Sequence, residues 1–264
     1  MYRCPLCQHP LTLSERQYQC VNRHSFDIAK EGYVNLLPVQ QKNSKDPGDN
    51  KEMMAARRAF LTAGWYNPLA EAVASCLAQL KPETLLDLGC GEGYYTATIK
   101  RATPATELYG ADISKSAIKY AAKAHSNILF SVASAYQLPF ADNSFDAVVR
   151  IYAPSKVDEL QRLIRSGGHL LTVTPGPDHL LEVKQAVYDK VRLHDDAITP
   201  IDGFTHQQRK RLEFKLNFTK PADVMALVQM VPLAWKFSNE HKQQFADSLP
   251  AISIDFLLDL YQRT

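Results

Sequence analysis

With 264 residues, the chain can form one large domain and a small attachment, and its 30 Lys and Arg nearly balance its 28 Asp and Glu. Because the formal net charge is only +2, any nucleic-acid contact must come from a local basic patch, and no apolar run approaches the roughly 20 residues that cross a bilayer. The amino terminus lacks the apolar segment of a signal peptide, and the five cysteines, an odd number, argue against a disulfide framework and for a reducing cytoplasm.

Four candidate metal ligands lie near the amino terminus in the spacing Cys-x2-Cys-x12-Cys-x3-His, at Cys4, Cys7, Cys20 and His24. Three thiolates and one imidazole can close a tetrahedron around Zn²⁺, which is typical of a structural site because a catalytic zinc keeps one position open. The alternative is a set of free side chains that share this spacing by chance. About 40 residues bury too little apolar surface to fold alone, so we expect metal binding to supply much of the folding free energy. His9 falls outside the spacing and is expected at the surface.

A small zinc ribbon is predicted from three short segments with alternating side chains, namely Gln17–Cys20, Ser25–Ala29 and Tyr33–Leu37. Its aromatic residues Tyr18, Phe26 and Tyr33 lie beside basic residues and could stack on exposed RNA bases. The same rings could equally form the core of so small a ribbon.

A polar, turn-rich segment follows, so we divide the chain into a zinc-ribbon domain (1–38), a linker (39–50) and a larger domain (51–264). Asp49 or Asn50 can cap a helix that begins near Lys51 and ends at Gly64, and Pro68 suits the first turn of the next helix. That second helix has an apolar stripe, predicted to be buried, at Leu69, Ala72, Val73, Cys76, Leu77 and Leu80.

The most informative segment is a short apolar strand that ends at Asp87 and runs into three alternate glycines, Gly89, Gly91 and Gly93. Glycine permits positive φ and lets a ligand approach the main chain, as in nucleotide-binding turns between a strand and a helix. The spacing is neither that of a phosphate-binding loop nor that of a dinucleotide fingerprint. It resembles motif I of the class I S-adenosylmethionine-dependent methyltransferases; the alternative is a glycine-rich turn without a ligand.

Strands and helices alternate after this loop. The expected strands are 107–111, 128–132, 145–151 and 169–173, and the expected helices are 114–124 and 156–164. Such alternation implies a parallel sheet with helices on both faces. Toward the carboxyl terminus, two alternating segments around 212–218 and 252–260 flank a helix opened by Pro221. The resemblance to class I methyltransferases implies that these segments are the antiparallel pair closing a Rossmann-like, seven-stranded α/β sheet.

In such a sheet the ligand lies across the carboxyl ends of the strands. Asp112 stands at the end of the second strand, where its carboxylate can accept both ribose hydroxyl hydrogens; alternatively it caps the next helix, a role that Ser114 also fits. Ser134 and Ala135 follow the third strand, where this fold packs the adenine.

The segment 150–154 ends the fourth strand, where the methyl acceptor is expected. It lacks the Asp/Asn-Pro-Pro-Tyr/Phe motif of amino-directed DNA methyltransferases, and no cysteine there could serve as the nucleophile of a pyrimidine-C5 enzyme. Arg150 and Tyr152 are candidates for orienting the acceptor, although Arg150 could instead form a structural ion pair. The general base remains unassigned.

Nearly the whole chain resembles the RlmA family of bacterial 23S ribosomal RNA guanine-N1 methyltransferases. The resemblance is carried by the metal-ligand module and by the segments 30–37, 46–49, 87–96, 151–154 and 174–177. It implies S-adenosylmethionine as methyl donor, a structural Zn²⁺, a guanine in a hairpin loop of 23S RNA as acceptor, and a cytoplasmic homodimer whose cleft accommodates RNA. It leans toward the proteobacterial branch rather than the macrolide-resistance branch.

The same resemblance implies cofactor contacts at Tyr66, Gly91, Glu92 and His179, although His179 could be a solvated residue at a helix start. Two other functions stay open. One is a small-molecule methyltransferase, of the kind that acts on quinone precursors, with a structural zinc domain. The other is a non-catalytic RNA-binding protein. The zinc module favours RNA, because a small acceptor needs no second recognition surface. The segment 194–210 shows no periodicity and no assigned role.

Overall fold

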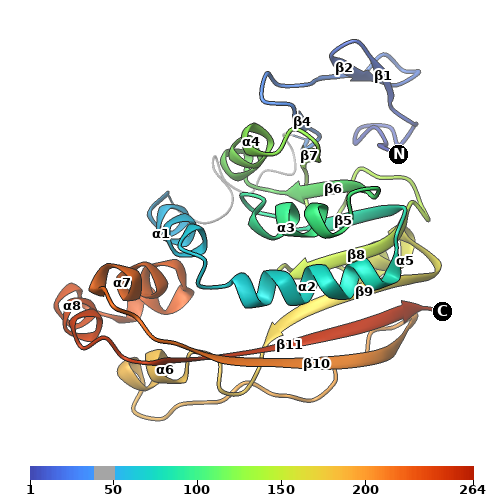
Figure 1. The fold of residues 1–264 in the computed structure, drawn as a ribbon. Helices are drawn as coiled ribbons and strands as arrows, with labels where there is room; N and C mark the ends of the chain where they lie inside the picture. Colours follow the sequence, from blue (N-terminus) through green and yellow to red (C-terminus); the bar gives the residue numbers. More distant parts are fainter. Residues whose placement is uncertain (39–50) are drawn as a thin grey trace.

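The computed structural model describes residues 1–38 and 51–264, which form two sheets (Figure 1). The smaller sheet is an antiparallel ribbon of β1 (Thr12–Ser14), β2 (Gln17–Gln19) and β3 (Ser25–Asp27). The predicted linker 39–50, with the helix cap at Asp49 or Asn50 and part of the family-like segment 46–49, lies outside the described residues.

The larger sheet has eight strands in the order β10-β11-β9-β8-β5-β6-β7-β4. Their bounds are β4 (Val34–Asn35), β5 (Thr84–Leu88), β6 (Glu107–Asp112), β7 (Leu129–Val132), β8 (Phe145–Ile151), β9 (Ile164–Pro175), β10 (Phe204–Leu216) and β11 (Ile252–Arg263). Strands β4 to β9 pair in parallel, whereas β11 is antiparallel to both of its neighbours. The expected antiparallel pair at the carboxyl terminus is therefore confirmed.

The prediction of seven strands was one short. The additional strand is β4, which comes from the amino-terminal region and pairs in parallel with β7 through Val34 and Asn35. The alternating segment Tyr33–Leu37, predicted as part of the ribbon, contains this strand, but its ladder joins it to the large sheet instead. Strand β10 also begins earlier than expected, because its polar first half is held by the ladder with β11 rather than by alternating apolar residues.

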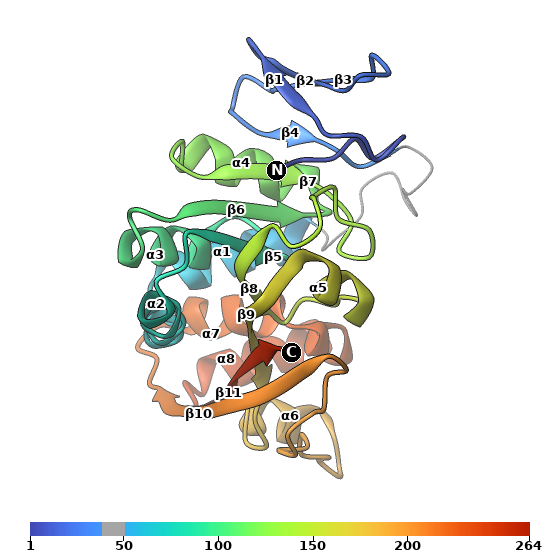
Figure 2. The ribbon, with the colours of Figure 1, turned by 90° about the vertical axis from the view of Figure 1, so that its right-hand side faces the viewer.

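Helices cover both faces of this sheet (Figures 1 and 2). They are α1 (Lys51–Thr62), α2 (Asn67–Leu80), α3 (Tyr94–Ala102), α4 (Lys115–Ala124), α5 (Val157–Leu163), α6 (Leu181–Val187), α7 (Pro221–Met230), the 3₁₀ helix η2 (Pro232–Lys236) and α8 (Asn239–Asp247). Two clusters of buried hydrophobic side chains form the core. In the larger cluster, one face of the large sheet packs against every α-helix except α5. In the smaller cluster, the other face packs against α5 and the ribbon. The predicted helix starts are confirmed at Pro68 and Ser114, whose Oγ accepts the Ala117 N–H. Helix α1 ends two residues before the predicted Gly64. No helix in the described parts is long and apolar enough to cross a membrane.

The ribbon is docked on the large sheet by aromatic packing. The buried ring of Tyr2 lies 5.0 Å from Phe140, 5.6 Å from Tyr109 and 5.2 Å from Tyr18, measured between ring centroids. Phe26 is also packed against this cluster and Tyr33 is buried in the larger one. The structure thus favours packing over base stacking for the ribbon's aromatic residues.

Candidate functional site

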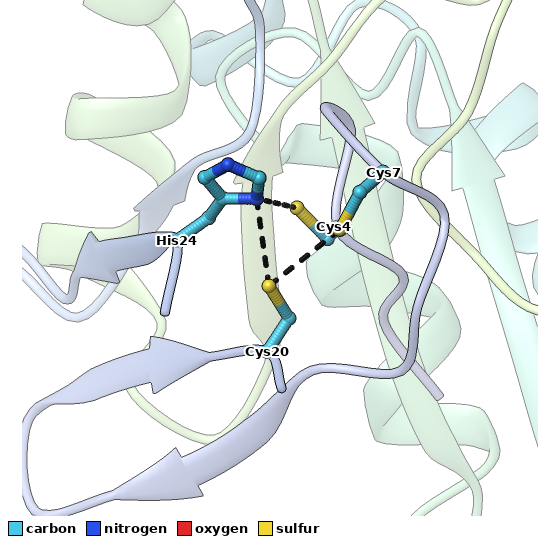
Figure 3. Close-up of side chains that lie close together, drawn as sticks. All are labelled: Cys4, Cys7, Cys20 and His24. Carbon is cyan, nitrogen blue, oxygen red and sulfur yellow. Dashed lines mark hydrogen bonds between the residues drawn. The ribbon is translucent and has the colours of Figure 1, made fainter. Parts of the chain in front are cut away.

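The four predicted metal ligands converge at one end of the ribbon, with all ligand atoms within 4.8 Å of one another (Figure 3). His24 Nδ1 lies 3.5 Å from the sulfurs of both Cys4 and Cys20, and the sulfurs of Cys7 and Cys20 are 3.6 Å apart. A tetrahedron with Zn–S of about 2.3 Å and Zn–N of about 2.0 Å has edges of roughly 3.5–3.8 Å. The donor set therefore fits a closed, structural zinc site.

The loop after Cys7 also suits thiolate ligands. The backbone N–H of His9 is the main cause that lowers the pKa of Cys7 to about 5. His9 itself is exposed, as expected, and its Nδ1 lies 3.1 Å from the Cys7 carbonyl oxygen. A backbone that stabilises the ionised sulfur prepares this side chain for a cation.

The three glycines of the loop after β5 have different roles. All have positive φ, of +76° at Gly89, +55° at Gly91 and +84° at Gly93. A Cβ built on Gly89 would lie 2.5 Å from the Cβ of Ala153, so this position is closed by the end of β8. A Cβ on Gly91 would meet no atom within 4 Å. Gly91 therefore borders open space at the switch point between β5 and β8, which is a cradle that a side chain would fill.

Asp112 at the end of β6 fixes the loop. One carboxylate oxygen accepts the Gly91 N–H at 3.0 Å, and the other accepts the Ser114 N–H at 2.8 Å. The carboxylate thus both anchors the loop and supports the start of α4. Ser134 and Ala135 are half-buried just beyond β7, at the same carboxyl edge of the sheet.

Asp87 is buried beneath the loop, where its Oδ2 accepts the Thr96 hydroxyl at 2.6 Å. Burial raises the pKa of Asp87 to about 7, the nearby Asp112 adds to the increase, and the Thr96 hydrogen bond opposes it. Burial of an ionisable carboxyl group destabilises the fold more than burial of a neutral side chain would. A residue kept at such a cost is typical of a functional site.

This carboxyl group predicts a pH-dependent stability difference. Between about pH 4 and 7 the folded chain keeps a proton that the unfolded chain releases, so Asp87 lowers stability progressively as pH rises through that window. We expect Asp87→Asn, whose amide oxygen can still accept from Thr96, to unfold at a higher temperature than the wild type at pH 8. The gain, up to about 4 kcal/mol, should vanish near pH 4. The exposed Asp189→Asn serves as control, and a gain that is independent of pH would contradict the assignment.

Glu92, the fourth residue of the loop, forms an ion pair with Arg58 of α1. Arg58 Nε donates to one carboxylate oxygen at 2.8 Å and Nη2 to the other. The guanidinium carbon also lies 4.0 Å above the ring of Tyr120. Arg58 was not found from the sequence, because nothing in the local pattern of α1 distinguishes it from its neighbour Arg57.

Tyr152 and His179 meet beyond the ends of β8 and β9. The Tyr152 hydroxyl lies 3.4 Å from His179 Nε2, and the Asp255 backbone N–H donates to Nδ1 at 3.4 Å. Burial, reinforced by Lys184 and His194, lowers the pKa of His179 to about 3, so the ring is neutral at physiological pH. With only 6% of its surface exposed, His179 is not the solvated residue considered as an alternative.

Aromatic rings surround this pair. His179 and Tyr152 both contact Phe256, at centroid distances of 4.7 and 5.9 Å, and the buried Tyr66 packs edge-on against the same ring at 5.2 Å. Tyr152 has a φ of +56°, an unfavourable conformation for a residue other than glycine, and its side chain remains half-exposed. Tyr66, His179 and Tyr152, predicted from separate segments, therefore lie in one cluster.

Arg150 does not join this cluster. It lines a separate cavity of about 240 Å³ with Thr172, Asp259 and Tyr261, and its Nη1 donates to Ser155 Oγ at 2.7 Å. Burial lowers the pKa of its guanidinium. Among the described residues, no carboxylate lies within ion-pair distance of Arg150, so the structural ion pair considered as an alternative is absent there.

Another acidic group, formed by Asp178, Glu213 and Asp255, is paired with one arginine. The Arg211 guanidinium lies 2.8 Å from Asp255, 3.2 Å from Glu213 and 3.7 Å from Asp178. This arginine holds the carboxylate of Asp255, the residue whose backbone N–H donates to His179.

Comparison with known families matches two parts of the chain. Residues 2–45 match the family described as "RlmA, N-terminal", a zinc ribbon, and residues 85–171 match the family described as "Methyltransferase domain". The first match contains the four metal ligands, and the second contains the glycine loop and the ends of β6 to β8.

Two relatives match over almost the full length. The 23S rRNA (guanine(748)-N(1))-methyltransferase of Streptomyces fradiae is 33% identical over 95% of this chain and 91% of its own. A Bacillus subtilis protein, provisionally named for the guanine-N(1) reaction on 23S rRNA, is 31% identical over 98% of this chain and 97% of its own.

Methyltransferases with other acceptors also match, over less of the chain. The malonyl-[acyl-carrier protein] O-methyltransferase of Hahella chejuensis is 32% identical over 60% of this chain and 62% of its own. Among solved structures, that of MccD protein aligns with a TM-score of 0.50 at 18% identity, over 75% of this chain and 98% of that chain. This last likeness supports the fold alone.

Proposed function

Because the chain belongs to the family of 23S rRNA guanine-N1 methyltransferases, we propose that it transfers a methyl group to N1 of a guanine in a hairpin loop of 23S ribosomal RNA. The observation that carries this proposal is the combination of a zinc-ligand cluster and a class I methyltransferase sheet in one chain, matched along its length by relatives of that activity. S-adenosylmethionine is the donor, and Zn²⁺ is structural.

We propose that the cofactor lies across the carboxyl ends of β5, β6 and β7. The residues assigned to it are Tyr66, Asp87, Gly89, Gly91, Glu92, Gly93, Asp112, Ser134, Ala135 and His179. The open space at Gly91 supports this placement, as does the position of Asp112, whose carboxylate holds the Gly91 N–H at the same edge of the sheet. When bound, the sulfonium supplies an electrophilic methyl group, so alignment matters more than covalent catalysis.

In this proposal His179 reaches the cofactor pocket through its contact with Tyr152. Its second role is to orient the Tyr152 hydroxyl. Since the Asp255 N–H occupies Nδ1, the proton of the neutral ring is on Nε2, which donates to Tyr152 Oη. The hydroxyl proton of Tyr152 is then directed away from His179. At neutral pH the phenol of Tyr152 is protonated, because its usual pKa is about 10 and the shift of its pKa is upward, so this hydroxyl is a donor and not a base.

Guanine N1 carries a proton at neutral pH and lies on the Watson–Crick edge, so the base must be presented from a loop or flipped. As the N1 proton passes to solvent water, since Tyr152 and His179 both act as donors, negative charge develops on O6. A fixed hydroxyl donor at O6 would stabilise this charge. We propose that Tyr152 is this donor and that His179 positions it; Arg150, whose Nη1 donates to Ser155 Oγ, is the weaker of the two candidates.

Tyr152→Phe is therefore expected to reduce kcat about 100-fold, since one oxyanion donor is lost. The dissociation constant of the cofactor should remain unchanged, because the ring and its contact with Phe256 are retained. Single-turnover methylation and calorimetric titration measure the two effects. Tyr120→Phe, at an exposed tyrosine of α4, is the matched control. An unchanged kcat in Tyr152→Phe would reduce Tyr152 to a packing role.

We further propose that the ribbon (1–38) recognises RNA, that the larger domain (51–264) carries the reaction, and that the active form is a cytoplasmic homodimer. The resemblance to the RlmA family supports these points, and the five unpaired thiols suit a reducing compartment. Light scattering of the zinc-loaded chain tests the dimer, for which a mass of two chains is expected.

The decisive experiment is incubation with labelled S-adenosylmethionine and undermodified 23S RNA, followed by digestion and identification of the nucleoside. We expect 1-methylguanosine, and its absence would reject the proposal. Labelling of a quinone precursor instead of RNA would establish the small-molecule alternative, which the partial match to O-methyltransferases makes less favourable. Neither product would be expected from a non-catalytic RNA-binding protein.

A further inference from the structure

An exposed aromatic and basic surface lies beyond the candidate reaction centre. Trp235 of η2 keeps 73% of its surface exposed, more than any other exposed aromatic side chain in the described parts of the chain. The Lys236 ammonium lies 4.2 Å from the centre of the Trp235 ring and 5.5 Å from that of Tyr188. Two rings from segments 47 residues apart thus share one cation.

Further positive charge follows Tyr188 in the sequence. Lys190 and Arg192 are exposed and come two and four residues after Tyr188, and the acidic Asp189 lies between Tyr188 and Lys190. We name Tyr188, Lys190, Arg192, Trp235 and Lys236 the Trp235 surface. Aromatic faces combined with Lys and Arg suit a partner that offers both flat rings and negative charge, which is the chemistry of single-stranded nucleic acid.

The position of the Trp235 surface relates it to the reaction centre. Tyr188 directly follows α6, and α6 begins two residues after His179. A helix of seven residues is about 10 Å long, so the surface lies within reach of nucleotides next to a base held at Tyr152. Helices α6, α7 and α8 gather at the same end of the sheet (Figure 1).

We infer that the Trp235 surface binds an unpaired nucleotide of the RNA substrate, with the base stacked on Trp235 and the basic residues facing phosphates. This inference rests on the proposed function, since it identifies RNA as the occupant.

Binding of an unmodified stem-loop transcript, which spans the hairpin around guanine 748 of 23S RNA, tests the inference without turnover. Trp235→Ala should weaken RNA binding about tenfold or more, as expected for loss of one stacked base. Trp235→Phe should retain most of the affinity. Lys236→Gln should cost about threefold and lower the salt dependence. The matched charge control is Lys123→Gln, in the last turn of α4, which should bind as the wild type.

The outcomes separate the two proposals. Unchanged binding by Trp235→Ala, with 1-methylguanosine still formed by the wild type, would overturn the inference and leave the proposed reaction intact. Binding that depends on Trp235 without formation of 1-methylguanosine would support the inference and reject the reaction. If Trp235→Ala instead converts a dimer to a monomer, the surface is an interface between copies of the chain and the inference is wrong.

Discussion

Gly91→Val is expected to abolish S-adenosylmethionine binding, with an increase of at least about 100-fold in the dissociation constant measured by calorimetry. A side chain at this position would project into space that no atom of the described chain fills within 4 Å of its Cβ. The valine would therefore displace the ligand rather than a neighbouring residue. It would also disturb the N–H that Asp112 holds at 3.0 Å.

Backbone strain has to be separated from this steric effect, because Gly91 has a φ of +55°. Gly167 in β9 provides the matched control, since it also has positive φ, +75°, and open space around a built Cβ. Gly167→Val should lower the melting temperature by a similar amount and leave cofactor affinity unchanged. Normal cofactor affinity in folded Gly91→Val would refute the placement of the cofactor at this loop.

The double substitution Cys4→Ser with Cys20→Ser is expected to release zinc and abolish methylation of RNA. Apparent zinc affinities in small modules are worth about 10–16 kcal/mol, far more than a ribbon of this size can supply by burial. The ribbon should therefore unfold, and amide exchange should accelerate throughout residues 1–35. Cofactor affinity should persist, because its proposed contacts come from the other domain.

Cys76→Ser is the control for loss of a thiol, because Cys76 is half-buried on α2 and lies outside the metal-ligand cluster. It should retain one zinc per chain and full activity. The amino-terminal region also contacts the large sheet, through the packing of Tyr2 on Phe140 and the pairing of β4 with β7. Equal loss of cofactor binding in the double variant would show that the ribbon supports the whole sheet.

Much of this architecture follows from local signals in the sequence. The spacing of Cys4, Cys7, Cys20 and His24 predicts the metal cluster, because tetrahedral ligands must come in pairs from tight turns. The glycine loop, the cap at Ser114 and the apolar periodicity of α2 likewise depend on residues within a few positions of one another. Such signals are set by backbone geometry and need no tertiary partner.

Other features depend on which distant segments meet, and only the tertiary structure decided them. Arg58 reaches Glu92 because the first helix packs beside the loop, and Tyr152 meets His179 because two strand ends are adjacent. The segment of β4 alternates in the sequence, but its place in the large sheet is decided by its pairing with β7. Arg150 and Tyr152 are only two positions apart in the sequence, yet their side chains have different partners. In each case the packing of the whole fold selects the contacts between remote residues, and no local pattern encodes them.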